Sequence, residues 1–169
     1  MPRMRSVLLA LALSHILLSS SFANIEPRHF IKPALKGIPT VHITVVVDAE
    51  LGKAGLSWSN ILEDAEQQLR SAGIRVGKME DLGAKELGIR IRSDKPSMPV
   101  WSVLTTVSLF QGVSLDRDPK IRLIGVETWK VDILRSVGEE DLESIRSDVR
   151  ATLGLFVQDY QEVNGRPKR

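Results

Sequence analysis

The sequence predicts an α/β protein of the α+β kind, a two-layer sandwich in which two helices cover one face of a five-stranded mixed sheet. Three observations lead to this prediction. Apolar residues alternate strictly from Val41, which is typical of a half-buried strand. Two long alternating segments flank a tight turn at 116–119, which predicts a hairpin. A helical stripe of apolar residues then closes the chain, so that the element order is β-α-β-β-β-β-α.

The first three elements form a β-α-β unit. The first strand covers 41–47, and a loop containing glycines follows it. A helix is expected over 57–72 with Ser57 as its N-cap, because serine side chains satisfy free N–H groups at helix starts. A glycine ends this helix, and a short strand is expected at 74–79. The crossover predicts that the two strands run parallel.

The middle of the chain predicts an antiparallel meander. A short alternating strand at 87–92 precedes two long strands at 101–115 and 121–134. Average strands have only about five or six residues. We therefore expect a β-bulge near Gly112 or Gly125, where it would relieve the twist of so long a hairpin.

The closing helix has the clearest pattern in the sequence. Its apolar residues recur every three or four positions, as on one face of a helix: Leu142, Ile145, Val149, Leu153, Phe156, Tyr160 and Val163. Such spacing also suits a coiled coil, but the flanking alternation of charges is missing. We expect the helix to lie on the sheet.

The N-terminus predicts export from the cytoplasm. Arg3 and Arg5 precede a short apolar run, and Ser21-Phe22-Ala23 resembles a cleavage signal. This order is the layout of a cleaved signal peptide over 1–23, so we expect a secreted or periplasmic protein. Extended lead-in residues follow at 24–39, a single α/β domain at 40–164, and a basic tail at 165–169.

Composition excludes several classes of function. Without the two signal arginines, basic and acidic residues balance, so nothing in the charge predicts a nucleic-acid partner. The absence of cysteine excludes disulfides, a thiol nucleophile and thiolate metal sites. No second hydrophobic stretch is long enough to span a membrane.

The sequence offers no catalytic, metal or cofactor site. His29 and His42 do not have the spacing of metal ligands, and a site formed by His42 with Asp48 and Glu50 would need a third element to converge on it. No G-x-S-x-G nucleophile motif occurs. The three tryptophans, Trp58, Trp101 and Trp129, fall on apolar stripes and are expected in the core rather than on a carbohydrate platform.

One loop has a composition that could bind an anion. Gly52, Lys53, Gly55 and Ser57 lie between the first strand and the first helix, where free N–H groups and the helix dipole favour negative charge. The spacing is not that of a phosphate-binding P-loop. Glycines in such a connection usually serve the turn, and this simpler interpretation competes with the anion site.

The outer face of the sheet is the candidate interaction surface. Leu104, Phe110, Ile124 and Val126 fall on the side away from the helices by simple alternation. Apolar residues on such a face suit self-association or a protein partner. We therefore expect a non-enzymatic exported domain that binds another envelope or extracellular component. The alternative is a small-ligand (anion) binder or hydrolase that uses the 52–57 loop.

Two resemblances accompany these patterns. The closing Phe156-x-x-Asp159-Tyr160-x-x-x-Asn164 resembles the ends of exported bacterial proteins of unknown function. In element order, the chain is similar to the small N-terminal α/β domains of periplasmic envelope proteins, such as the Tol-Pal propeller protein and the curli-secretion lipoprotein. These resemblances imply export and a two-layer fold.

Overall fold

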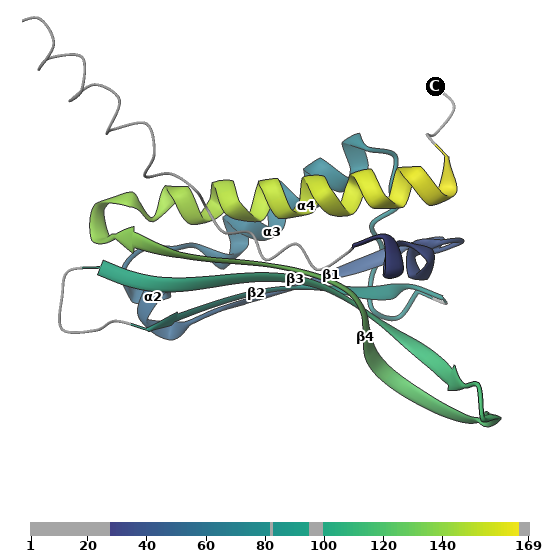
Figure 1. The fold of residues 1–169 in the computed structure, drawn as a ribbon. Helices are drawn as coiled ribbons and strands as arrows, with labels where there is room; N and C mark the ends of the chain where they lie inside the picture. Colours follow the sequence, from purple (N-terminus) through teal and green to yellow (C-terminus); the bar gives the residue numbers. More distant parts are fainter. Residues whose placement is uncertain (1–27, 82, 95–99, 166–169) are drawn as a thin grey trace, which may run out of the picture.

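Two helices lie across one face of a single mixed sheet (Figure 1). A computed structural model describes residues 28–81, 83–94 and 100–165 of the chain. The helices of this layer are α3 (Trp58–Ser71) and α4 (Glu143–Asn164), and a short α2 (Ala49–Lys53) follows the first strand at the end of the sheet. The strands are β1 (Val41–Val47), β2 (Lys85–Asp94), β3 (Val100–Leu115) and β4 (Asp118–Gly138). The two-layer architecture is therefore confirmed.

The sheet has four strands, in the order β1-β2-β3-β4, and the prediction of five was wrong. β1 and β2 are parallel, and the other two pairs are antiparallel. The expected second strand makes only an isolated bridge between Val41 and Val76. A turn stops it from extending, because the Lys78 N–H donates to Asp81 Oδ2 at 2.7 Å. The buried Ile74 and Val76 still pack in the core.

The β3–β4 hairpin changes register where the glycines predicted a bulge. Between the pairs Gln111–Val126 and Val113–Leu123, β4 has one more residue than β3. Gly125 lies there with φ of 70°, a left-handed conformation that glycine adopts without strain. A second shift inserts Thr128 between the partners of Leu109 and Phe110. The bulge near Gly125 is thus confirmed.

The core lies between the helices and the sheet. Ile145, Val149, Leu153 and Phe156 of the α4 stripe are buried against it, as predicted. Phe156 packs edge to face on Trp129 of β4, with ring centroids 5.1 Å apart. The prediction that all three tryptophans lie in the core was wrong for Trp58, which is 58% exposed. It stands in the first turn of α3, where the buried Leu56 and Ile61 already close the end of the helix.

The residues before β1 fold onto the domain. The expected extended lead-in forms two 3₁₀ turns, η1 (Arg28–Phe30) and η2 (Lys32–Leu35), as far as the structure describes it. Leu35 and Ile38 belong to the core. The predicted signal peptide, and the tail after Gly165, lie outside the described residues.

A buried carboxylate ties this N-terminal segment to the helix layer. Asp159 of α4 has no exposed surface and accepts a hydrogen bond from Trp129 Nε1 at 3.0 Å. Arg28 and Lys32 form ion pairs with it at 3.0 and 3.3 Å. Lys32 also donates to Glu162, which raises the pKa of Lys32 and lowers that of Glu162. The segment is therefore anchored by charge as well as by apolar packing.

Candidate functional site: the open face and the arm

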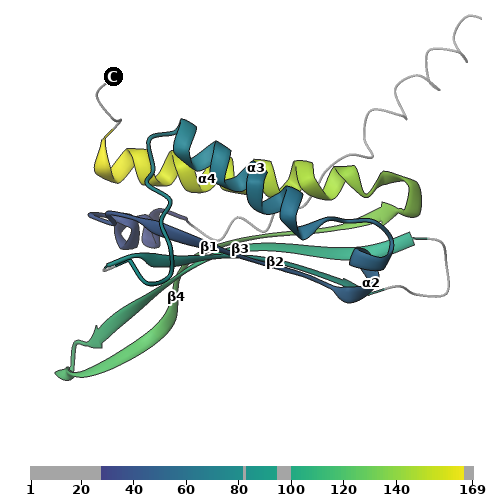
Figure 2. The same cartoon turned by 180° about the vertical axis from the view of Figure 1, so that it is seen from behind.

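The sheet face turned away from α3 and α4 has no covering element in the described structure (Figures 1 and 2). We call it the open face. It carries the alternate residues of each strand, chiefly Thr44 and Val46 of β1, Glu86, Gly88 and Arg90 of β2, Leu104, Thr106, Ser108 and Phe110 of β3, and Lys130, Asp132 and Leu134 of β4. Apolar, polar and charged side chains are thus mixed on one surface.

A hollow of about 270 Å³ lies in the open face. It is lined by residues of the three strands that meet there: Thr44, Val46, Glu86, Gly88, Ile89, Arg90, Thr106, Ser108 and Phe110. Gly88 leaves it open, because a Cβ at this position would stand 3.1 Å from Cε2 of Phe110. The aromatic ring therefore leans over a glycine on the neighbouring strand, a pairing that helps to fix strand register.

Polar groups around the hollow are held by cross-strand hydrogen bonds. The Thr44 hydroxyl donates to Glu86 Oε1 at 2.8 Å. On the other side, Ser108 donates to Glu127 at 2.7 Å, and Thr106 donates to Asp132 at 2.6 Å. These bonds fix the carboxylates in place before any partner binds.

The hollow is charged oppositely at its two ends. Glu86 and Arg90 lie on either side of Gly88 along β2, about 13 Å apart by strand geometry. The Arg90 side chain is exposed and forms no ion pair with any residue that the structure describes. One end thus presents a carboxylate beside an aromatic ring, and the other presents a guanidinium.

The far half of the hairpin projects from the body of the molecule (Figures 1 and 2). We call residues 111–126 the arm. Val113 pairs with Leu123, so their side chains share one side of the ribbon. Ile121 stands two residues before Leu123 on β4, and a further register shift at the tip pairs Leu115 with Asp118. Ile121 and Leu123 remain 41% and 42% exposed, because the arm lies beyond the helix layer.

The bulges separate the four predicted interaction residues. Leu104 and Phe110 lie on the open face as expected. Val126 pairs with Gln111, whose amide reaches Ala34 O at 2.9 Å on the covered side, so Val126 was assigned to the wrong face. Ile124 is 94% exposed within the arm bulge. Alternation alone could not place them, because each bulge residue reverses the side on which later residues lie.

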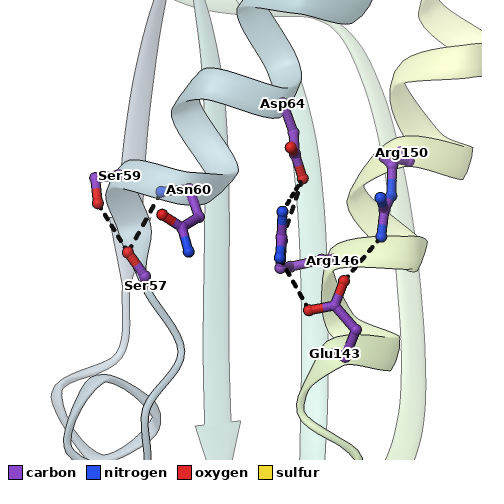
Figure 3. A network of polar contacts seen from close by, with 7 residues as sticks. All are labelled: Ser57, Ser59, Asn60, Asp64, Glu143, Arg146 and Arg150. Atoms are coloured by element: carbon purple, nitrogen blue, oxygen red, sulfur yellow. Dashed lines mark hydrogen bonds and ion pairs between the residues drawn. The ribbon is translucent and has the colours of Figure 1, made fainter.

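The predicted anion-binding loop has its polar groups engaged within the chain. Lys53 donates to Glu50 Oε1 at 2.7 Å, and this contact raises the pKa of Lys53. The Ser57 hydroxyl accepts from the Asn60 N–H at 3.3 Å and contacts the Ser59 hydroxyl at 2.8 Å (Figure 3). Gly52 lies in α2 and Gly55 in the turn after it. The hollow described above is lined by none of the residues of this loop.

A polar network joins the two helices instead of forming a site. Arg146 of α4 donates to Asp64 of α3 through Nε and Nη2, at 3.1 and 2.7 Å, and to Glu143 at 3.0 Å (Figure 3). The hydrogen bonds to Asp64 and Glu143 raise the pKa of Arg146, and the contact with Asp64 has the larger effect. The network fixes α3 against α4, so the helix layer covers the sheet as a unit.

The described residues contain no group of three or more His, Cys, Asp or Glu side chains that could hold a metal ion. His42 pairs with Glu86 across β1 and β2, and Asp48 caps α2 by accepting from Glu50 N. Within the part of the chain that is described, no helix is long and apolar enough to cross a membrane.

Sequence reasoning missed Asp159 and Arg90. Asp159 follows Phe156 by three residues and therefore lies on the buried side of α4, a position where an acid is rare without a partner. That signal was readable from the helical stripe. The hollow was not, because it depends on Gly88 facing Phe110 of another strand.

Comparisons with known proteins leave the family open. No family model matches the chain, and no curated protein matches it. Among solved structures, it is similar to a dodecamer of a PelC variant from Paraburkholderia phytofirmans, with 14% identity over 74% of this chain and 87% of that chain and a TM-score of 0.41. It is also similar to a minor lipoprotein from Acinetobacter baumannii, with 14% identity over 75% of this chain and 93% of that chain and a TM-score of 0.29. At these values the likeness carries no functional argument.

Proposed function

We propose that this protein is a non-enzymatic exported binding domain, and that the component it binds is a second copy of itself. The arm of one copy lies on the open face of the next. The observation that carries the proposal is the apolar surface of the arm, where Leu123, the partner of Val113, and Ile121 beside it stay exposed in the described chain.

A two-stranded ribbon is only marginally stable in water without a third strand or a layer to pack on. The arm has neither in a single described chain. Its apolar side would be stabilised by a second apolar surface that removes it from water. Contact with another protein supplies such a surface, whereas a small ligand or an anion covers too little of the ribbon.

The open face supports a second copy as the occupant. It keeps Val46 and Leu134 more than half exposed, so it also has apolar area to bury. Its charges are mixed, and the arm carries both signs as well, with Arg117 beside Asp116 and Asp118. An arm on the open face is a head-to-tail contact, which builds a closed ring or an open filament according to the angle between copies.

The alternative of a small-ligand binder or hydrolase at the 52–57 loop has less support. Lys53 is paired with Glu50, and the Ser57 hydroxyl caps its own helix. We expect residues 1–23 to direct export, so that the assembly forms in the periplasm or outside the cell.

Light scattering on the mature chain over a range of concentrations tests the proposal. The wild type is expected to form oligomers, and the double variant Ile121→Ser/Leu123→Ser is expected to lose at least tenfold in association, about 1.4 kcal/mol or more. Trp58→Ser is the matched control, because Trp58 is exposed and apolar but lies on α3 rather than on the arm. A wild type that stays monomeric at every concentration, or a control as damaging as the double variant, would overturn the proposal.

A further inference from the structure

The negative end of the hollow has the chemistry of a cation site. Glu86 and Phe110 are direct partners across β2 and β3, so a carboxylate and an aromatic ring stand side by side. Thr44 holds the carboxylate by a 2.8 Å hydrogen bond. A guanidinium binds such a pair in two ways at once, by an ion pair with the carboxylate and by stacking on the ring.

The opposite end of the hollow adds a second requirement for a ligand. Arg90, at the other end, is exposed and without an ion pair among the described residues. A ligand that fits both ends carries a cation next to an anion. The turn at the tip of the arm has this pattern, because Arg117 stands between Asp116 and Asp118.

The tip is presented to solvent and is long enough to reach the hollow of another copy. Arg117 is exposed, and the turn is held by the Lys120 N–H donating to Asp118 Oδ1 at 3.1 Å. From Gln111 to Asp116 the arm extends by about 17 Å, whereas four strands span about 14 Å across a sheet. The arm also bends away from the helix layer, so its tip is free of its own helices (Figure 2).

We propose that the hollow is a receptor for a guanidinium group, and that Arg117 of a second copy fills it. The inference rests on the proposed function. Arg117 binds Glu86 and stacks on Phe110, and the neighbouring Asp116 faces Arg90. This contact selects the register of the assembly, while the apolar side of the arm provides most of the burial.

Charge exchange tests the pairing. Arg117→Glu and Glu86→Lys, each measured by sedimentation, are expected to weaken association by about tenfold or more. The double variant restores the opposite charges and is expected to return to within about threefold of the wild type. Arg122→Glu is the matched control, since it reverses a charge on the same arm away from the tip, and it is expected to change association by less than about threefold.

A second experiment does not depend on the folding of the charge variants. The chain has no cysteine, so introduced thiols are the only ones present. A mixture of the Arg117→Cys and Glu86→Cys proteins is expected to form a disulfide-linked heterodimer under mild oxidation, well above the yield of an Arg122→Cys and Glu86→Cys mixture.

The outcomes separate the two proposals. If the wild type associates but the exchanged double variant is no better than the single variants, or the two thiol mixtures crosslink equally, this pairing is wrong and the proposed function stands. If Arg122→Glu weakens association as much as Arg117→Glu, only net charge matters and the pairing is again wrong. If the wild type is monomeric throughout, both proposals fail.

Discussion

The two halves of the β3–β4 hairpin have similar sequences and opposite surroundings. In the body half, Val103, Val107 and Leu109 alternate with polar residues and are fully buried beneath the helices. In the arm, Val113 and Leu115 continue the same alternation on the same strand, but Leu123, the partner of Val113, stays 42% exposed. The register shift that contains Gly125 lies between the two halves. The far part of the hairpin bends away from the helix layer (Figure 1).

The difference shows what each half needs for stability. The body half is covered by α4, and its Trp129 is fixed by Phe156 and by the Asp159 carboxylate. Beyond the Gln111 amide, which reaches Ala34 O at its base, the arm is stabilised by its own cross-strand pairs, each of which contributes roughly 0.2–1 kcal/mol. An alternating apolar pattern thus predicts a buried face, but another element has to supply the cover. For the arm, we infer that a second copy supplies it.

Loss of the Asp159 carboxylate should have the largest effect on the body half. Asp159→Ala leaves Arg28 and the Trp129 indole without this acceptor and leaves Lys32 only Glu162, so we expect the free energy of unfolding in urea to fall by about 3–5 kcal/mol. Glu162→Ala is the control, because Glu162 is an exposed partner of the same lysine. If Asp159→Ala lowers the free energy of unfolding no more than Glu162→Ala does, the body half does not depend on this buried carboxylate.

A matched pair of leucine substitutions compares the two halves directly. Leu109→Ala, in the body, is expected to cost about 2–5 kcal/mol because it opens a cavity in the core. Leu123→Ala, in the arm, is expected to cost less than about 1 kcal/mol when measured on dilute protein. Chemical denaturation of both variants provides the values, and equal costs would mean that the arm is already packed within one chain.

The sequence predicted the elements whose pattern is local. The α4 stripe and the β1 alternation are repeated within one segment, so the buried residues followed from spacing alone. The glycine at position 125 marked a bulge for the same reason. These features depend on backbone conformation and on the side that a residue faces, both of which neighbouring residues determine.

Features that depend on distant residues could not be predicted in this way. The 74–79 segment looked like a strand, yet a hydrogen bond from Lys78 to Asp81 turns the chain before a ladder forms. Val126 lies on the covered side and not on the open face, because a residue is inserted in β4 relative to β3. The hollow needs Gly88 and Phe110 on adjacent strands, and no pattern within either strand shows that they meet.

Hydrogen exchange at several protein concentrations tests the central claim most directly, because amide protection reports the local stability of each half separately. In dilute protein, amides of residues 111–126 are expected to exchange quickly while those of 100–110 and 127–138 stay protected. As concentration rises, the arm should gain protection and the body half should not change. An arm that is as protected as the body in dilute protein, or one that stays unprotected at every concentration, would contradict the claim that a second copy covers it.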